Sequence, residues 1–194
     1  MKRITVAALM SVGLAWAALN GCTKKADEPH QQEGPPSVVQ GSVTNSAAGV
    51  RWSVPQRWEE QPARQMRVTT YSIPAAGGDE DDGECAVFYF GREQGGNVDA
   101  NIERWAAQFE NSPDPERSTR QVNGMTVTAV QVSGTYLSPG GPMMQSQAKK
   151  ENYRLRGAIV EAAEGLVFFK FTGPAATVEA AESEFDGLIS SMTK

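Results

Sequence analysis

The chain contains few of the side chains that carry out nucleophilic or metal chemistry. It has one histidine, His30, and two cysteines, Cys22 and Cys85. No histidine follows His30, so Ser–His and Cys–His nucleophile systems and the usual zinc ligand sets are excluded beyond that point. No nucleophile-elbow, phosphate-loop or dinucleotide-binding motif occurs. We therefore expect no catalytic residues and no cofactor, although the 23 acidic residues leave a two-carboxylate hydrolase open.

An acidic run between Gly77 and Glu84 is the part of the sequence that most resembles a metal-binding loop. Its carboxylates, which include Asp79, Asp81 and Asp82, are oxygen ligands of the kind that calcium prefers. The order of an EF-hand loop fails, because a glycine stands where the third ligand should be. The sequence predicts no metal site and leaves these three aspartates as weak candidates; the alternative is a solvated turn between two strands.

A segment rich in glycine and proline contains two adjacent methionines. Pro142, Met143 and Met144 follow two glycines. Methionine adapts its shape to many partners, and exposed apolar residues in a loop are typical of contact surfaces. We predict that these three residues contact a protein partner. The alternative is that the methionines fold back over the sheet as part of the core.

The first 22 residues have the layout of a secretory signal. Two basic residues precede an uncharged apolar run of about 16 residues, shorter than the roughly 20 that a membrane-spanning helix needs. Leu19-Asn20-Gly21-Cys22 then resembles the bacterial lipobox, in which the signal is cut before a cysteine that becomes lipid-modified. The resemblance implies a signal peptide at 1–21 and lipidation at Cys22. The alternative is cleavage of an ordinary signal near Ala18.

The residues after Cys22 and the overall charge bear on location and partners. Thr23 and Lys24 follow the cysteine, and by resemblance to lipoprotein sorting in Gram-negative bacteria the absence of aspartate implies the outer membrane, facing the periplasm. Removal of residues 1–21 leaves 16 basic and 23 acidic residues, a formal charge of −7. This charge opposes binding to nucleic acid. We expect a protein of the bacterial cell envelope that contacts the membrane through its lipid anchor and binds an envelope protein, but no nucleic acid.

Residues 22–48 are interpreted as a flexible tether that begins with the lipidated cysteine. They contain three prolines, many polar residues and few large apolar side chains, so they cannot offset the entropy of ordering. Residues 49–194 are long enough for one domain with its own core. Because Cys22 is expected to be acylated, Cys85 has no partner for an internal disulfide, and we expect it to be a buried apolar residue.

The domain shows strand patterns and helix patterns in alternating groups. The clearest strand covers residues 84–90, where apolar side chains point to both faces, so we expect a central strand covered on both sides. Helical spacing of apolar residues runs from Val98 to Phe109 and again after Pro174. The pattern predicts an α+β fold in which an antiparallel or mixed sheet is flanked by helices.

The domain also resembles a known fold, the photosystem extrinsic-protein (PsbP-like) fold. This similarity rests on Val50-x-Trp52-x-Val54-Pro55-x-x-Trp58, on the helix around Trp105 and on the closing amphipathic helix. More narrowly, the chain resembles bacterial lipoproteins of uncharacterised function that carry such a domain. That similarity rests on four blocks: Phe88-Tyr89-Phe90-Gly91, Asn101-Ile102-x-Arg104-Trp105-x-x-Gln108-Phe109, Gly141-Pro142-Met143-Met144 and Phe169-Lys170-x-Thr172-Gly173-Pro174.

The resemblance implies a function class rather than a reaction. Domains of this fold generally act as accessory or binding modules. We therefore expect a membrane-anchored, non-catalytic accessory module that binds a protein partner. The alternative is a carrier of a small ligand, with a pocket between sheet and helix, and a hydrolase of unknown type is the third hypothesis.

Overall fold

The computed structural model describes residues 44–138 and 148–194. In this part of the chain the backbone forms nine strands and three helices. In chain order they are β1 (Thr44–Ala47), β2 (Val50–Ser53), β3 (Glu59–Glu60), β4 (Thr69–Ile73), β5 (Gly83–Tyr89), α1 (Val98–Ala106), β6 (Glu116–Val122), β7 (Met125–Ser138), β8 (Ala148–Ala162), β9 (Gly165–Pro174), α2 (Ala175–Ala180) and α3 (Glu182–Ser190). Of the helices in the described ranges, none is both long and apolar enough to span a bilayer.

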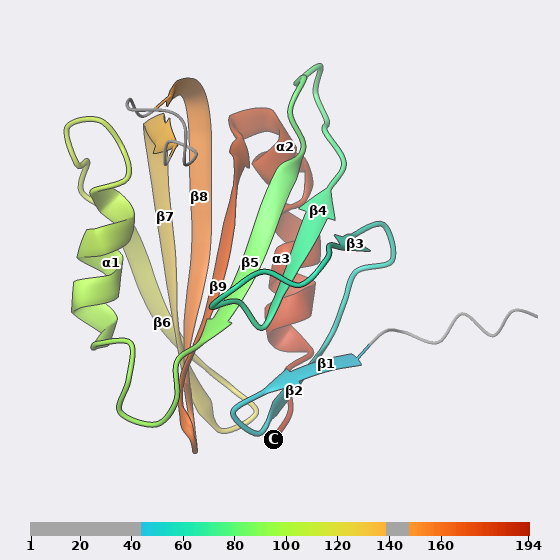
Figure 1. The fold of residues 1–194 in the computed structure, drawn as a ribbon, viewed down its shortest axis with the longest axis vertical. Helices are drawn as coiled ribbons and strands as arrows, with labels where there is room; N and C mark the ends of the chain where they lie inside the picture. The colour runs from blue at the N-terminus through green and yellow to red at the C-terminus, as the bar shows by residue number, and fades with distance from the viewer. Residues whose placement is uncertain (1–43, 139–147) are drawn as a thin grey trace, which may run out of the picture. The chain divides into compact units, whose positions relative to one another are not determined.

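Seven strands form one antiparallel sheet in the order β3-β4-β5-β9-β8-β7-β6 (Figure 1). The central strand is β9, which pairs with β5 on one side and with β8 on the other. β1 and β2 form a separate two-stranded hairpin. The predicted α+β fold, a sheet flanked by helices, is confirmed, and the sheet is antiparallel rather than mixed.

Successive side chains of the neighbouring strands β5 and β9 point to opposite faces of the sheet. Cys85, Phe169 and Phe171 belong to the larger core cluster, whereas Phe168 belongs to a smaller one on the other face. Successive side chains of a strand point in opposite directions, so a strand that is apolar throughout must be covered on both sides. The expectation for residues 84–90 is thus confirmed for the face of Cys85 and Val87, whereas on the other face Phe88 borders a cavity and Phe90 is 36% exposed.

The larger core lies between the sheet, α2, α3 and the β1–β2 hairpin. The Trp52 ring lies edge-on against Phe169 with a centroid distance of 5.0 Å, and its Nε1 donates to the buried Tyr71 hydroxyl over 3.1 Å. The hairpin is also joined to the end of the chain, because Arg51 and Thr193 exchange two backbone hydrogen bonds of 2.8 and 2.9 Å. These contacts hold the hairpin against the domain.

α1 covers part of the opposite face. Ile102 and Trp105 of this helix pack on side chains of β7, β8 and β9 in the smaller cluster. The Trp105 ring lies so close to β8 that a Cβ added at Gly157 would be 2.3 Å from it. Asn97 caps the helix by accepting a 2.8 Å hydrogen bond from the Ala100 amide. Beyond the end of α1, the same face of the sheet carries a cavity.

The first described strand lies in a region that the sequence places in the tether. Residues 44–47 form β1 because Ala48 and Gly49, with φ angles of 52° and 78°, make a two-residue turn that returns the chain onto β2. The strand is polar and short, so it carries no alternating pattern of its own. The described fold therefore begins at residue 44, ahead of the boundary at residue 49 that the sequence predicts.

The closing amphipathic pattern, which the sequence presents as one helix, is divided into α2 and α3. Ala181 separates them, with φ −100° and ψ 5°, and it is fully buried. Val178 in α2 and Phe185 in α3 both belong to the larger core. The break lets both helices direct their apolar residues at a sheet that twists beneath them.

Candidate functional site

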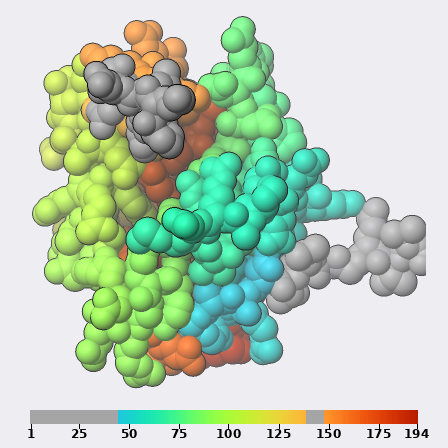
Figure 2. Space-filling model, viewed as in Figure 1, coloured from blue at the N-terminus to red at the C-terminus, as the bar shows by residue number. Residues whose placement is uncertain are grey.

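A cavity of about 380 Å³ opens on the sheet face that carries α1. Figure 2 shows the hollow beside the green β4–β5 segment, and red atoms of the C-terminal part of the chain are visible within it. Its lining mixes cationic, acidic, aromatic and small side chains: Arg67, Asp82, Glu84, Ala86, Phe88, Gln108, Tyr136, Ser138, Lys150, Tyr153, Lys170 and Thr172.

Strand register brings these side chains together from distant parts of the sequence. On β5 and β9, Glu84 pairs with Thr172 and Ala86 with Lys170, so all four lie on one face. On β7, a register shift between Gly134 and Tyr136 interrupts the regular pairing with β8. The turns after α1 add Gln108.

Lys170 is the most unusual of the lining residues. Its ammonium donates hydrogen bonds to the Gln108 Oε1 and, over 3.3 Å, to the Tyr136 hydroxyl, and it lies 5.4 Å from the centre of the Tyr136 ring. Both partners are neutral, and Lys170 makes no ion pair with the described residues. Burial lowers the pKa of this lysine from 10.5 to about 8. Among further influences, Glu84 raises this pKa and Arg67 lowers it.

Two stacked tyrosines form one wall. The Tyr136 and Tyr153 rings are nearly parallel, at an interplanar angle of 7° and a centroid distance of 5.9 Å. Lys150 lies 5.2 Å from the centre of the Tyr153 ring and pairs with Asp81 over 2.8 Å, and the Tyr153 hydroxyl donates to the same carboxylate over 2.7 Å. The hydrogen bond from Lys150 holds the pKa of Asp81 below its ordinary value. Lys150 is thus already neutralised by a partner.

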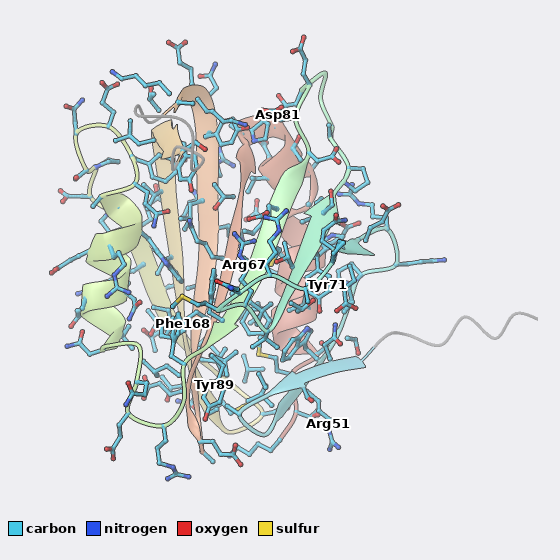
Figure 3. All side chains as sticks on the ribbon, viewed as in Figure 1. Arg51, Arg67, Tyr71, Asp81, Tyr89 and Phe168 are labelled. Atoms are coloured by element: carbon cyan, nitrogen blue, oxygen red, sulfur yellow. The ribbon has the colours of Figure 1, made fainter. Side chains whose placement is uncertain are left out.

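Arg67 and Glu84 form the opposite wall. The guanidinium lies 5.7 Å from the centre of the Phe88 ring and pairs with Glu84 over 2.8 Å. Arg64 is a second partner of the same carboxylate, at 2.9 Å. In Figure 3, Arg67 lies over the middle of the sheet and Asp81 at its upper end. Two arginines therefore balance the single charge of Glu84.

The hydroxyl of Thr172 is buried and has no hydrogen-bond partner within the described residues. Buried polar groups of folded proteins nearly always have one. Thr172 lines the cavity two residues after Lys170 on β9. On one face of β9, the cavity is therefore lined by a lysine without an ion pair and by a threonine whose hydroxyl is unsatisfied, both with respect to the described residues.

The residues that the sequence singles out for lipidation and partner contact, Cys22 and Pro142, Met143 and Met144, lie outside the described residues. Both hypotheses therefore stay predictions. Residues 139–147 connect β7 to β8, whose Ser138 and Lys150 line the cavity.

The three aspartates considered for calcium have three different sets of partners. Asp79 accepts hydrogen bonds from the amide and the hydroxyl of Thr177, at 2.8 and 2.7 Å, at the start of α2. Asp82 accepts from the Ser72 hydroxyl over 3.1 Å and from the Ala75 amide. Asp81 belongs to the tyrosine wall. Within the described ranges, no group of three or more histidine, cysteine, aspartate or glutamate side chains is arranged to hold a metal ion.

The sequence interpretation included a pocket between sheet and helix only as an alternative, and Asp82 is the one lining residue that it singled out, although more of the lining was within reach. Phe88, Gln108, Lys170 and Thr172 belong to three of the four blocks that carry the narrower resemblance. Lys170 also interrupts the apolar run 166–171, and a charge in a central strand is a signal in itself. Arg67, Tyr136 and Tyr153 carry no such signal, because their meeting depends on the pairing of strands.

The sequence matches no protein-family model and no curated protein. Among solved structures, it is similar to cyanobacterial PsbP (CyanoP) from Synechocystis, with a TM-score of 0.51 and 12% sequence identity. The match covers 84% of this chain and 98% of that one. At this level of identity the similarity concerns the fold alone. The chain therefore has a PsbP-like fold, an antiparallel sheet with helices on both faces.

Proposed function

We propose that this protein is a non-catalytic accessory module of the bacterial envelope, anchored through Cys22, that binds a small ligand in the cavity between the sheet and the end of α1. The observation that carries the proposal is Lys170, a lysine without an ion pair among the described residues, in a cavity of about 380 Å³. The geometry favours the small-ligand carrier, which the sequence ranks behind a protein-binding module.

The size and composition of the cavity support a small ligand. Ligand sites are concave, run from about 300 to 1,000 Å³ and combine apolar walls with a few polar groups that converge. Here Ala86 and Phe88 supply apolar surface, and Lys170, Thr172 and Gln108 supply polar atoms. The volume is at the lower end of that range, which fits a metabolite-sized molecule better than a peptide.

The chemistry of the side chains supports binding rather than catalysis. Cys85 is fully buried in the larger core, and burial raises the pKa of its thiol far above the ordinary value, so the reactive thiolate is disfavoured. Glu84 is balanced by two arginines, and Asp82 accepts hydrogen bonds from its own hairpin. Neither carboxylate of the cavity is placed as a free acid or base.

The test is to purify the full-length processed protein from native membranes in mild detergent and to measure its mass under native conditions. We expect a bound small molecule in the wild type. Ala86→Leu fills the cavity beside Lys170 and should remove that mass, whereas Ala180→Leu, on the exposed end of α2, should keep it. A wild-type protein without bound mass, or a bound mass that Ala86→Leu leaves in place, contradicts the proposal.

A further inference from the structure

Three cationic side chains, Arg67, Lys150 and Lys170, line the cavity against two carboxylates, Asp82 and Glu84, and of these cations only Lys170 has no ion pair among the described residues. Lys150 pairs with Asp81, and Arg67 shares Glu84 with Arg64. Within the described part of the chain, the Lys170 ammonium donates its hydrogen bonds to the neutral Gln108 and Tyr136. In a chain with a formal charge of −5, this cavity is thus a local site of the opposite sign, and it suits a ligand with a single negative charge.

The unsatisfied hydroxyl belongs to a residue that lines the same cavity. Lys170 and Thr172 are two residues apart on one face of β9, and this spacing puts their Cα atoms about 7 Å apart. A carboxylate can accept one hydrogen bond from each side chain, because its two oxygens point in different directions. An anion in this position would satisfy both the ammonium and the hydroxyl of Thr172.

The rest of the lining favours an organic anion over an inorganic one. Ala86 lies directly across from Lys170 and leaves space beside it, and Phe88 continues the same face of β5. Tyr136, a residue that is 9% exposed, borders the other side. A phosphate or sulfate ion would leave this apolar surface unused, since burial of apolar area is the main source of affinity in such sites.

We propose that the ligand is a small organic monocarboxylate, whose carboxylate binds Lys170 and Thr172 and whose apolar body lies over Ala86 between Phe88 and Tyr136. This inference rests on the proposed function, because it names the class of ligand for the same cavity.

The charge state of Lys170 makes such binding dependent on pH. The groups that face Lys170 are Glu84 on β5, Arg67 before β4, Tyr136 on β7, Asp82, and Lys150 and Tyr153 on β8. Burial raises the pKa of both tyrosines above 10, and the hydrogen bond to Asp81 raises the pKa of Lys150 above 10.5. With a pKa of about 8, Lys170 loses its charge first as the pH rises. Monocarboxylate affinity should then fall above pH 8, approaching tenfold per pH unit.

The test uses benzoate as the probe, benzamide as its neutral counterpart and inorganic phosphate, titrated into the full-length processed protein by calorimetry and by amide chemical shifts. We expect benzoate to bind and the other two to bind at least tenfold more weakly. Lys170→Met should abolish benzoate binding. Lys149→Met, which removes an exposed lysine that pairs with Glu110, should leave it unchanged. Circular dichroism checks that both variants fold.

The outcomes separate this inference from the proposed function. Equal binding of benzoate and benzamide, or benzoate binding that survives Lys170→Met, overturns the monocarboxylate and leaves a cavity that binds ligands. A bound molecule that native mass measurement identifies as neutral or cationic overturns the monocarboxylate in the same way. If no probe binds and no bound molecule is found, the proposed function fails as well.

Discussion

Lys170 places an ammonium in the central strand of a sheet, where apolar side chains are the norm. Its neighbours in sequence, Phe169 and Phe171, belong to the larger core, and its own side chain enters the cavity on the other face. Burial without an ion pair opposes the charged form and therefore opposes folding while the lysine is charged. The charged lysine therefore lowers the stability of the folded domain, and such destabilising groups are typical of binding sites.

The first prediction concerns the pH dependence of stability. The folded-state pKa of Lys170 is lowered to about 8 from 10.5, so the unfolded chain holds the proton more tightly between these values. The penalty is complete below pH 8 and is relieved as the pH rises toward 10.5. Lys170→Met should therefore be more stable than the wild type at pH 7, by on the order of 3 kcal/mol, and the difference should shrink by pH 10.

Urea unfolding of both proteins at pH 7 and pH 10 measures this difference. Subtracting the two curves removes the contribution of the tyrosines, whose titration the proteins share. Lys149→Met serves as the control and should show no such trend, because its lysine is exposed. A constant difference between wild type and Lys170→Met at all pH values would contradict the assigned pKa.

The second prediction concerns Thr172. Thr172→Val keeps the shape of the side chain and removes a buried hydroxyl without a partner, so it should stabilise the free protein by about 1 kcal/mol. It should also weaken benzoate binding several-fold, because the carboxylate loses a donor.

Thr177→Val is the matched comparison. The Thr177 hydroxyl is fully buried, donates to Asp79 and accepts from the Ala76 amide, so its loss should lower the free energy of unfolding by about 1–3 kcal/mol. Thermal unfolding and titration of both variants measure the two effects, and a destabilised Thr172→Val refutes the assignment.

At this scale the sequence reaches only part of the site. A lysine within an apolar strand and a glutamine after a helix are visible in the residue pattern. That Gln108 accepts from Lys170 depends on residues 62 positions apart, and the stack of Tyr136 on Tyr153 depends on the register shift in β7. The periodicity of side chains predicts which face of a strand a residue occupies, but it does not predict which strand lies beside it.

Among the elements, α1 determines the position of one edge of the cavity. Gln108 follows the helix closely, and the helix rests on β8 through the Trp105 ring over Gly157. A side chain at position 157 would push the ring away, and with it the segment that carries the acceptor of Lys170.

The third prediction follows from this contact. Gly157→Ala should destabilise the domain by about 1–3 kcal/mol, because the added carbon must displace the Trp105 ring. Gly187→Ala in α3 is the control: an added Cβ there meets nothing within 4 Å, and alanine should stabilise the helix by about 0.5–1 kcal/mol. Chemical unfolding measures the change in the free energy of unfolding for each variant, which should be negative for Gly157→Ala and positive for Gly187→Ala. Two equal effects would mean that Trp105 is not held against β8.

The elements themselves were mostly accessible from the sequence. β5 and β9 have apolar side chains at successive positions, so both of their faces are largely apolar. The apolar residues of α1 have helical spacing. The type of these elements therefore follows from the local pattern. β1 is missed because its polar residues gain order only by pairing with β2. The division of α2 from α3 is missed because the apolar spacing runs through Ala181 with no glycine or proline to mark the break.

On the scale of the whole molecule, one sheet separates two unequal cores. The larger core joins α2, α3 and the β1–β2 hairpin to one face, and the smaller core joins α1 to the other. The cavity lies on the face with the smaller core, where polar side chains can replace the apolar ones that a packed core would require. The other face supplies stability, and the fold can hold a polar cavity because of it.

The fourth prediction concerns the anchor, which rests on the sequence alone. Cys22→Ser should abolish incorporation of labelled palmitate and move the protein from the membrane fraction to the soluble one. Benzoate binding by this variant should equal that of the wild type, because the described residues that line the cavity begin at Arg67. Unchanged palmitate labelling of Cys22→Ser would show that lipid is attached elsewhere or not at all.

The backbone bonds between Arg51 and Thr193 decide how the domain responds to mechanical load. A pull that enters the domain through β1 passes first to β2 and then to the last residues of the chain, which Figure 1 shows beside β2. The seven-stranded sheet is not part of that first path. A pull applied through β1 would thus separate the terminal hairpin from the domain before the strands that line the cavity come apart.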